Sequence, residues 1–158
     1  MTSPKQETRW VLRAQSGDRE ALDELLKTVQ EPLYRYIQRL VSDAALAEDI
    51  LQEVFIRIYR KLGWLEAPEL FRPWAYRIAS RESFKRLKRE RRWAEQVRDE
   101  AVLEAIPVES QEETYEPELV EHLPEHISRV SPAARAVLVL HYMDEMSLGE
   151  VAEVLGIS

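Results

Sequence analysis

Residues 71–92 read FRPWAYRIASRESFKRLKRERR and carry nine basic side chains against two acidic ones, a local charge of +7. The chain as a whole carries -7, so its positive charge is concentrated in this stretch. At helical spacing five of the cations share one face, namely Arg77, Arg81, Lys85, Lys88 and Arg92. Like charges so arranged repel one another, and a polyanion along the face relieves the repulsion and releases counterions. The stretch therefore predicts a long helix that binds nucleic acid.

Aromatic side chains lie beside and within this basic stretch. They are Trp64, Phe71, Trp74, Tyr76, Phe84 and Trp93. Cations follow a phosphate backbone while aromatic rings stack on unpaired bases, so the combination is typical of single-strand binding. Two alternatives stay open. The basic run can be an ordinary solvated helix face, and Trp74 can be a core residue at the start of an amphipathic helix.

Apolar residues on either side of this stretch recur at helical spacing and predict an all-α fold. The low glycine content, four in 158 residues, also favours helices. The pattern predicts one helix up to Pro32, where it breaks, and a second over residues 33–41. A third helix follows through Leu62, with Tyr59 on its apolar face. Gly63 is placed to end it in a left-handed conformation.

The distribution of charge and proline divides the chain into three predicted parts. Residues 10–98 form an N-terminal helical domain, residues 99–117 an acidic linker, and residues 118–158 a smaller C-terminal unit. Ten acidic residues and no Lys or Arg lie between residues 99 and 125. The simpler interpretation is a flexible spacer extended by its own repulsion. The alternative is that these acids fold back on the basic face and lower nonspecific DNA binding.

The C-terminal unit carries clear helix boundary signals. Ser131 and Pro132 are a typical cap and first residue, and Ser147 with Glu150 forms a predicted capping box. Gly156 is placed to close that helix. The ending Gly-Ile-Ser has the form of a helix-turn-helix turn, but the second helix is absent from the 158 residues.

Composition narrows the function classes. An apolar content of 45% supports a packed core, and the absence of cysteine excludes disulfides and thiolate metal sites. No apolar run approaches 18 residues, so we expect a cytoplasmic protein with no membrane insertion and no classical secretion signal. The lack of cysteine is also compatible with a reducing cytoplasm.

Catalytic and metal sites are not supported by any motif. The chain lacks a Gly-rich phosphate loop, a nucleophile elbow and an HExxH sequence. His122 and His126 have the spacing of a ligand pair, but Pro124 between them disturbs the helix that would align their rings. We therefore expect surface histidines, no metal, no cofactor and no enzymatic activity.

Three motifs in order resemble the extracytoplasmic-function (ECF) group of bacterial sigma factors, the minimal kind with only regions two and four. AEDILQEVFIRIYRKL at residues 47–62 is similar to region 2.2, and FRPWAYRIAS at residues 71–80 to region 2.3. LGEVAEVLGIS at residues 148–158 resembles the first half of the region four helix-turn-helix. The resemblance implies a subunit that directs RNA polymerase to promoters and helps to open the minus-ten element.

The resemblance also implies roles for individual residues. Asp49, Gln52 and Glu53 would meet the clamp helices of the largest polymerase subunit. Promoter DNA would be bound by Trp64, Trp74, Arg77, Arg81, Lys85, Arg86, Lys88, Arg89 and Arg92. An anti-sigma factor is a further partner that the family allows.

Two departures from the family pattern qualify these expectations. Arg81 and Lys85 stand where the family often has Asn and Asp, which favours backbone affinity over base reading. The recognition helix of region four is absent, and whether the end at Ser158 is natural or a truncation stays open. The alternative function is a sigma-like interaction protein that binds polymerase or a regulator without initiating transcription.

Overall fold

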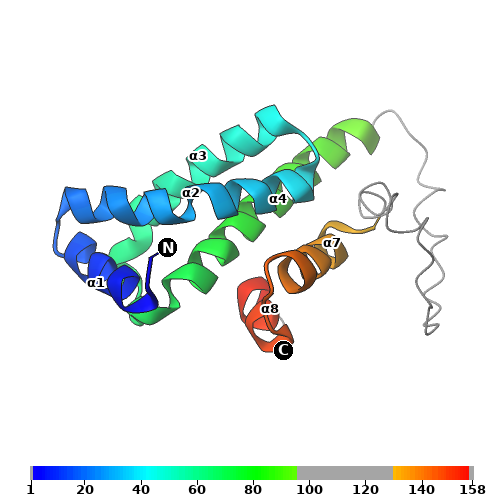
Figure 1. Ribbon diagram of the computed structural model, residues 1–158. Helices are drawn as coiled ribbons and strands as arrows, with labels where there is room; N and C mark the ends of the chain where they lie inside the picture. Colours follow the sequence, from blue (N-terminus) through cyan, green and yellow to red (C-terminus); the bar gives the residue numbers. More distant parts are fainter. Residues whose placement is uncertain (1, 96–129, 157–158) are drawn as a thin grey trace.

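The computed structural model describes residues 2–95 and 130–156, and every regular element in these ranges is a helix (Figure 1). The α-helices are α1 (Pro4–Gln15), α2 (Arg19–Val41), α3 (Ala44–Lys61), α4 (Phe71–Glu95), α7 (Pro132–Leu138) and α8 (Leu148–Leu155). Two 3-10 turns, η1 (Leu62–Trp64) and η2 (Pro68–Leu70), connect α3 to α4, and one π turn, η4 (Val139–Met143), follows α7. The predicted all-α fold is confirmed. The predicted linker, His122 and His126 lie outside the described residues.

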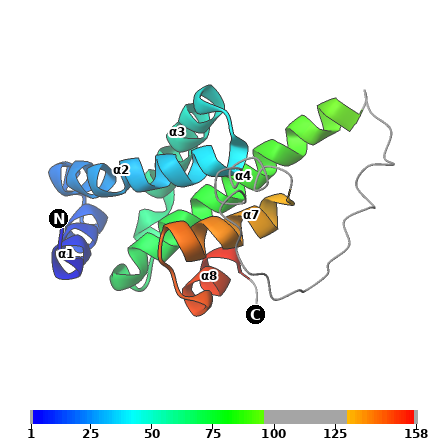
Figure 2. The ribbon, with the colours of Figure 1, turned by 45° about the vertical axis from the view of Figure 1, so that its right-hand side comes forward.

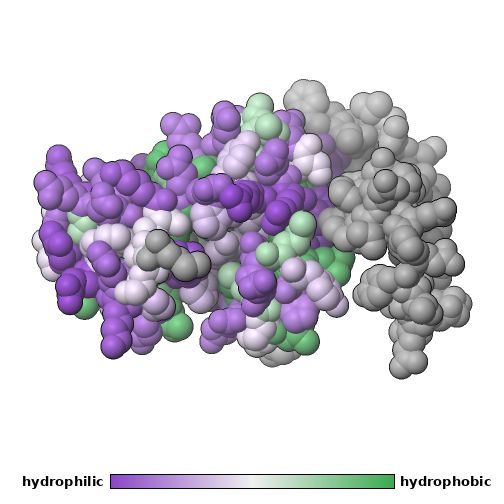
Figure 3. All heavy atoms as spheres, in the orientation of Figure 1, coloured by the Kyte–Doolittle hydropathy of each residue, from purple (hydrophilic) through white to green (hydrophobic). Residues whose placement is uncertain are grey.

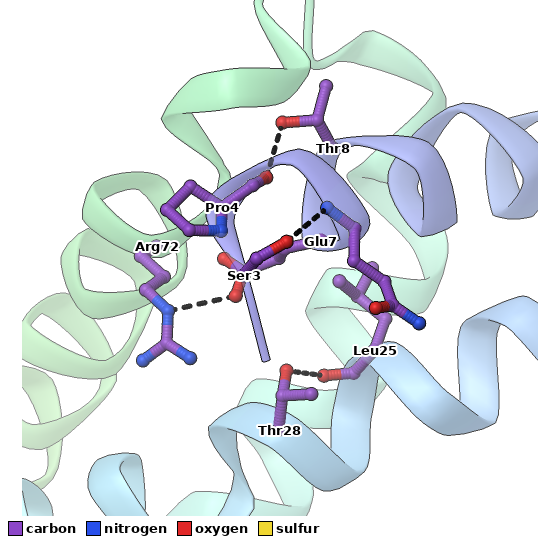
Figure 4. Close-up of polar contacts among 8 residues, drawn as sticks. Ser3, Pro4, Glu7, Thr8, Leu25, Thr28 and Arg72 are labelled. Carbon is purple, nitrogen blue, oxygen red and sulfur yellow. Dashed lines mark hydrogen bonds and ion pairs between the residues drawn. The ribbon is translucent and has the colours of Figure 1, made fainter. Parts of the chain in front are cut away.

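Helix α1 was not among the predicted elements. Ser3 caps it by accepting a hydrogen bond from the Gln6 backbone N–H, and Pro4 occupies the first turn (Figure 4). Glu7 on this helix is buried and accepts a hydrogen bond from Arg72 Nε of α4 at 2.9 Å. One of the nine cations of the basic stretch is therefore used to hold α1 against α4.

The predicted break at Pro32 is wrong, because α2 runs through this residue. Proline in a helix interior removes one backbone hydrogen bond and costs about 3 kcal/mol. Leu25, Val29, Leu33 and Ile37 lie on one face on both sides of it and are fully buried. Burying such side chains contributes about 1.5–3 kcal/mol each. The shared apolar face keeps the helix continuous.

The expected left-handed end at Gly63 is also wrong. Gly63 lies within η1 and has no positive φ, whereas Ser42 at the end of α2 is left-handed with φ 57°. The chain after α3 is instead held from α1, since the Gln15 side chain donates to the carbonyls of Leu62 at 2.9 Å and Leu65 at 2.8 Å. A contact distant in sequence fixes this turn.

The C-terminal helices pack on the first four rather than standing apart from them. Figures 1 and 2 show α7 and α8 lying against α4, and α8 packs chiefly on α4. Their buried residues join the core formed by α2, α3 and α4. These residues are Ala136, Val139, Leu140, Val151 and Val154. Arg135 of α7 is also buried and donates a hydrogen bond to the Leu40 carbonyl of α2.

The cap signals of this C-terminal unit are confirmed. The Ser147 hydroxyl accepts from the Glu150 N–H at 3.2 Å, and the Glu150 carboxylate accepts from the Ser147 N–H at 2.8 Å. Ser131 accepts from the Ala134 N–H at 3.3 Å, and Gly156 closes α8 with φ 68°. Within the described ranges, no helix is long and apolar enough to cross a membrane.

Candidate polymerase and nucleic-acid interface

The second half of α4 presents an exposed row of cations, which we call the basic face. It consists of Arg81, Lys85, Lys88, Arg89 and Arg91. All five side chains are exposed, whereas Ser83 is buried and Phe84 packs against the core on the other side of the helix. The side chain of Arg92, which the sequence placed on the same face, lies outside the described residues. Phosphates in solution can reach this row directly.

Arg77 does not join the basic face. Its side chain is half-buried beneath the end of α8, and its Nε is buried with no hydrogen-bond partner among the described residues. A Cβ built at Gly156 would lie 2.9 Å from Arg77 Nη2, which shows how closely the chain passes over the guanidinium. The predicted cationic face is therefore interrupted, because Arg77 lies apart from the exposed cations that begin at Arg81.

A cleft of about 510 Å³ lies between the start of α4, the preceding turn and α8. Its lining residues are Leu65, Leu70, Pro73, Trp74, Arg77, Ala152, Glu153 and Gly156. The walls are mainly apolar, with one cation and one carboxylate. Trp74 and Arg77, both predicted to bind the opened DNA strand, thus line a cleft together with residues of α8.

The aromatic side chains separate into two groups. Trp64 is 80% exposed at the end of η1, as a base-stacking residue requires. Trp74 is half-buried against the core, with its ring centroid 6.1 Å from that of Phe71. Phe71 and Tyr76 are buried, so the stacking interpretation is wrong for these two residues. They are core residues because α4 turns this side toward α2.

Tyr76 and its neighbours form a buried polar layer where the two halves of α4 meet. The rings of Tyr36 and Tyr76 lie 5.3 Å apart, and the Tyr36 hydroxyl and the Ser80 hydroxyl are 2.6 Å apart. Ser80 also donates to the Tyr76 carbonyl at 2.7 Å. Burial raises the pKa of both tyrosines, so each stays neutral at physiological pH.

Helix α3 presents acidic and amide groups opposite its buried face. Asp49 and Gln52 are exposed and Glu53 is half-buried, whereas Ile50 and Val54 are in the core. The three residues predicted to dock on polymerase therefore lie on the solvent-facing side of α3. Carboxylates on an exposed helix face can pair with arginines across an interface.

The apolar face predicted for α3 is wrong at one residue. Tyr59 is exposed, and so is Ile56, one helical turn beyond Gln52. Both residues extend the exposed surface of α3 beyond the acidic stripe. Periodicity could not reveal this, because an apolar residue at the edge of a helical stripe reaches either the core or solvent.

A polar groove of about 290 Å³ lies between α3 and α4 and joins the two predicted surfaces. Its lining residues are Asp49, Ile50, Glu53, Arg57, Glu82, Lys85, Arg86 and Arg89. Arg57 Nε lies 2.5 Å from Glu82 Oε1 and 3.4 Å from Glu53 Oε1, and Arg86 Nη2 lies 3.8 Å from Asp49 Oδ2. The acids predicted to dock on polymerase and the cations predicted to bind DNA are therefore adjacent and partly paired with each other.

Sequence reasoning missed Arg57 and Glu82 as members of this network. The four-residue spacing of Glu53 and Arg57 was a visible signal, but the pairing of Arg57 with Glu82 links different helices. Arg86 was assigned to DNA, and the structure places it within reach of Asp49 instead of fully in solvent. No cluster of three or more potential metal ligands occurs within residues 2–95 and 130–156.

Comparison with known proteins identifies the family. The model of sigma-70 region 2 matches residues 25–93, and that of sigma-70 region 4 matches residues 118–158. The ECF RNA polymerase sigma factor SigW of Bacillus subtilis (strain 168) is 27% identical over 156 residues, covering 93% of this chain and 83% of SigW. The chain belongs to the ECF group of sigma factors. It directs RNA polymerase to promoters.

Further relatives and one solved structure agree with this membership. The RNA polymerase sigma-H factor of Pseudomonas aeruginosa is 40% identical over 79 residues, half of this sigma factor and 41% of the relative. ECF RNA polymerase sigma factor BldN of Streptomyces coelicolor is 30% identical over 149 residues, 92% and 56% of the two chains. CnrH, solved in complex with the cytosolic domain of CnrY, shares the fold with a TM-score of 0.67 and 21% sequence identity. The match covers 97% of this chain and 84% of the CnrH chain.

Proposed function

We propose that this sigma factor divides its work between two adjacent helix faces. The exposed part of α3 around Asp49 and Gln52 docks on the clamp helices of the largest polymerase subunit. The basic face of α4 then holds the opened minus-ten strand by its phosphates. The observation that supports the division most directly is the exposure of both faces on either side of one groove.

The docking half of the proposal depends on charge pairing. Asp49 has an exposed carboxylate whose nearest described cation, Arg86, is 3.8 Å away, so an incoming arginine can replace that weak pair at little cost. Glu53 is more constrained because Arg57 holds it and Glu82 together. Asp49 and Gln52 are therefore the more accessible docking groups, and Glu53 positions Arg57.

The strand-binding half depends on the basic face and Trp64. Unstacking one base step costs about a few kcal/mol. Stacking on an exposed ring contributes about 1–3 kcal/mol per base, and phosphate contacts along α4 add to it. Trp64 is exposed at the end of η1, before the start of α4, so its ring is available to stack on an unpaired base. Arg81 and Lys85 are cations, so they favour phosphates over base edges.

A protein regulator is the third proposed partner. The fold shared with CnrH, whose structure contains the cytosolic domain of CnrY, is consistent with an anti-sigma factor for this chain. Figure 3 shows hydrophobic side chains at the surface over α7 and α8. Exposed residues in this part are Tyr142, Met143 and Leu148.

Asp49→Lys tests the docking half. We expect this variant to lose most of its affinity for core polymerase, because it places a cation where arginines of the partner would bind. Glu48→Lys is the matched control, since Glu48 is exposed on the same helix but faces a hollow shared with Lys27 and Tyr34 of α2. Pull-down with purified core polymerase measures the effect, and equal retention of both variants contradicts the assignment.

Transcription with the same proteins separates initiation from simple binding. Core polymerase with this sigma factor should produce short transcripts from a pool of promoter fragments, and the Asp49→Lys variant should not. Binding of the parent protein without any transcript would favour the alternative of a polymerase-binding module that does not initiate.

A further inference from the structure

Three residues of α1 share the face that this helix turns toward the rest of the protein. Glu7, Val11 and Gln15 are spaced four residues apart, so they lie one above another along the helix. Val11 is fully buried in the core. Glu7 and Gln15, about 12 Å apart along the helix axis, make polar contacts with opposite ends of the turn over residues 62–72.

Gln15 holds the start of this turn by its backbone. Its Nε2 atom donates to the Leu62 carbonyl at 2.9 Å and to the Leu65 carbonyl at 2.8 Å. A side-chain amide nitrogen carries two N–H donors, so both bonds can form at once. The exposed Trp64 lies between these two residues in the sequence. The backbone that carries its ring is therefore anchored on both sides.

Glu7 holds the end of the same turn. Its buried carboxylate accepts from Arg72 Nε at 2.9 Å, in the first turn of α4 (Figure 4). The arginine offsets the cost of burying the carboxylate. Between the two anchors, η2 packs on α1. Leu65 and Leu70 of this segment line the cleft at the start of α4, so α1 also supports one wall of that cleft.

Helix α1 precedes the part of the chain that matches the model of sigma-70 region 2, residues 25–93. The turn's own backbone bonds are short-range, from the Leu65 N–H to the Leu62 carbonyl at 3.1 Å and from the Leu70 N–H to the Ala67 carbonyl at 2.9 Å. A short segment of this kind depends on contacts with other elements to keep one conformation. In this protein α1 supplies such contacts.

We propose that α1 is a template for strand capture, in which Gln15 and Glu7 are positioning residues that preset the turn carrying Trp64. The inference rests on the proposed function, because it requires the Trp64 ring to stack on an unpaired base. A ring already held in its binding position loses less conformational freedom when DNA arrives, so preorganisation raises affinity. Gln15 acts through the backbone on both sides of Trp64, and Glu7 acts through Arg72.

Gln15→Met tests the template without DNA, because methionine has about the length of glutamine and no N–H donor. Gln6→Met is the matched control, since Gln6 is exposed on the same helix. The chain has no cysteine, so Glu66→Cys places one spin label on an exposed residue of the turn. Electron paramagnetic resonance should show a more mobile label with Gln15→Met and not with Gln6→Met. Equal mobility in the parent and both variants overturns the template.

DNA binding is measured by anisotropy with fluorescein-labelled oligothymidine and the cysteine-free proteins. Trp64→Ala should weaken binding about fivefold or more, the lower end of what stacking on one base contributes. Gln15→Met should weaken binding about threefold or more in the parent and should have no further effect in the Trp64→Ala background. Additive effects would show that Gln15 supports the fold in general, and they overturn the positioning role.

Rescue separates the lost donors from a change of shape. Gln15→Lys restores N–H donors and should recover most of the affinity, with Gln6→Lys as the control for added charge. An equal gain from Gln6→Lys overturns the positioning role. Gln15→Glu keeps the shape of glutamine but places a carboxylate against two carbonyls, so it should weaken binding even if methionine disturbs the packing of α1. Circular dichroism and retention on core polymerase check that the fold and the α3 surface are intact.

The same measurements distinguish failure of this template from failure of the proposed function. If Trp64→Ala leaves the affinity for oligothymidine unchanged, the stacking part of the proposed function is wrong and the template fails with it. If Trp64→Ala weakens binding and neither Gln15→Met nor Gln15→Glu does, the template alone is overturned.

Discussion

The first half of α4, residues 71–80, and the second half, residues 81–91, form one continuous helix in two different environments. In the first half Phe71, Ala75 and Ala79 are buried, and the end of α8 lies against Arg77. In the second half the cations of the basic face are exposed. Helical spacing determines which residues share a face, but the helices packed alongside decide which part of that face reaches solvent.

Phe71→Ala should have the largest effect on this comparison. Phe71 is fully buried at the start of α4, and truncating such a residue costs about 3–5 kcal/mol of unfolding free energy. Urea denaturation measures the loss. Lys88→Ala in the second half is the control and should change the same quantity by less than about 0.5 kcal/mol. Similar losses for both would mean that the two halves contribute equally to the core.

Local signals explain why much of the fold could be predicted. The caps at Ser131, Ser147 and Gly156 depend on residues three or four positions apart, and all three are confirmed. Helix α1 and the continuity of α2 through Pro32 depend on burial against distant elements. The ion pair between Glu7 and Arg72 joins residues 65 positions apart, so the sequence near α1 could not reveal it.

The candidate site was predictable to a smaller extent. The exposure of Arg81, Lys85, Lys88 and Arg89 agrees with the charge pattern, because these residues project from a helix with few neighbours on that side. Arg77 and Arg86 differ because α8 covers one and α3 brings an acid toward the other. Their environments depend on tertiary packing, which charge spacing does not encode.

Replacing cations in the second half of α4 with neutral residues should have the next largest effect, which is a loss of affinity for single-stranded DNA. Replacing Arg81, Lys85 and Lys88 with Gln should weaken single-strand binding at least about tenfold, which corresponds to about 1.4 kcal/mol. The slope of log affinity against log salt should decrease by about 2, since three phosphate contacts are lost. Fluorescence anisotropy over a salt series measures both quantities.

The control replaces as many cations outside α4. Lys5, Arg9 and Arg19 are exposed on α1 and α2, and Gln at these positions removes the same net charge. We expect a change of less than about threefold in affinity, because long-range attraction is screened beyond about 10 Å. Equal changes of salt slope in the two triple variants would mean that net charge, and not the basic face, governs binding.

Asp144→Asn should have the smallest effect, and it examines how the C-terminal helices pack near Tyr36 of α2 and Tyr76 of α4. Burial raises the pKa of Asp144 above its ordinary value, and the positive charges of Arg39 and Arg35 only partly oppose this. Since the folded state then binds the proton more tightly than the unfolded state, the contribution of this group to stability rises as the pH falls through the folded pKa. At neutral pH the ionised carboxylate weakens the packing of the C-terminal helices.

We therefore expect Asp144→Asn to stabilise the protein by less than about 1 kcal/mol at neutral pH, where it removes a half-buried ionised group. The advantage should shrink as the pH falls, because the parent gains the proton that Asn makes unnecessary. Thermal denaturation of both proteins between neutral and mildly acidic pH measures the difference. Glu145→Gln removes the adjacent exposed carboxylate and should leave the midpoint at neutral pH unchanged. A gain that is constant with pH would show that Asp144 acts through packing shape and not through its charge.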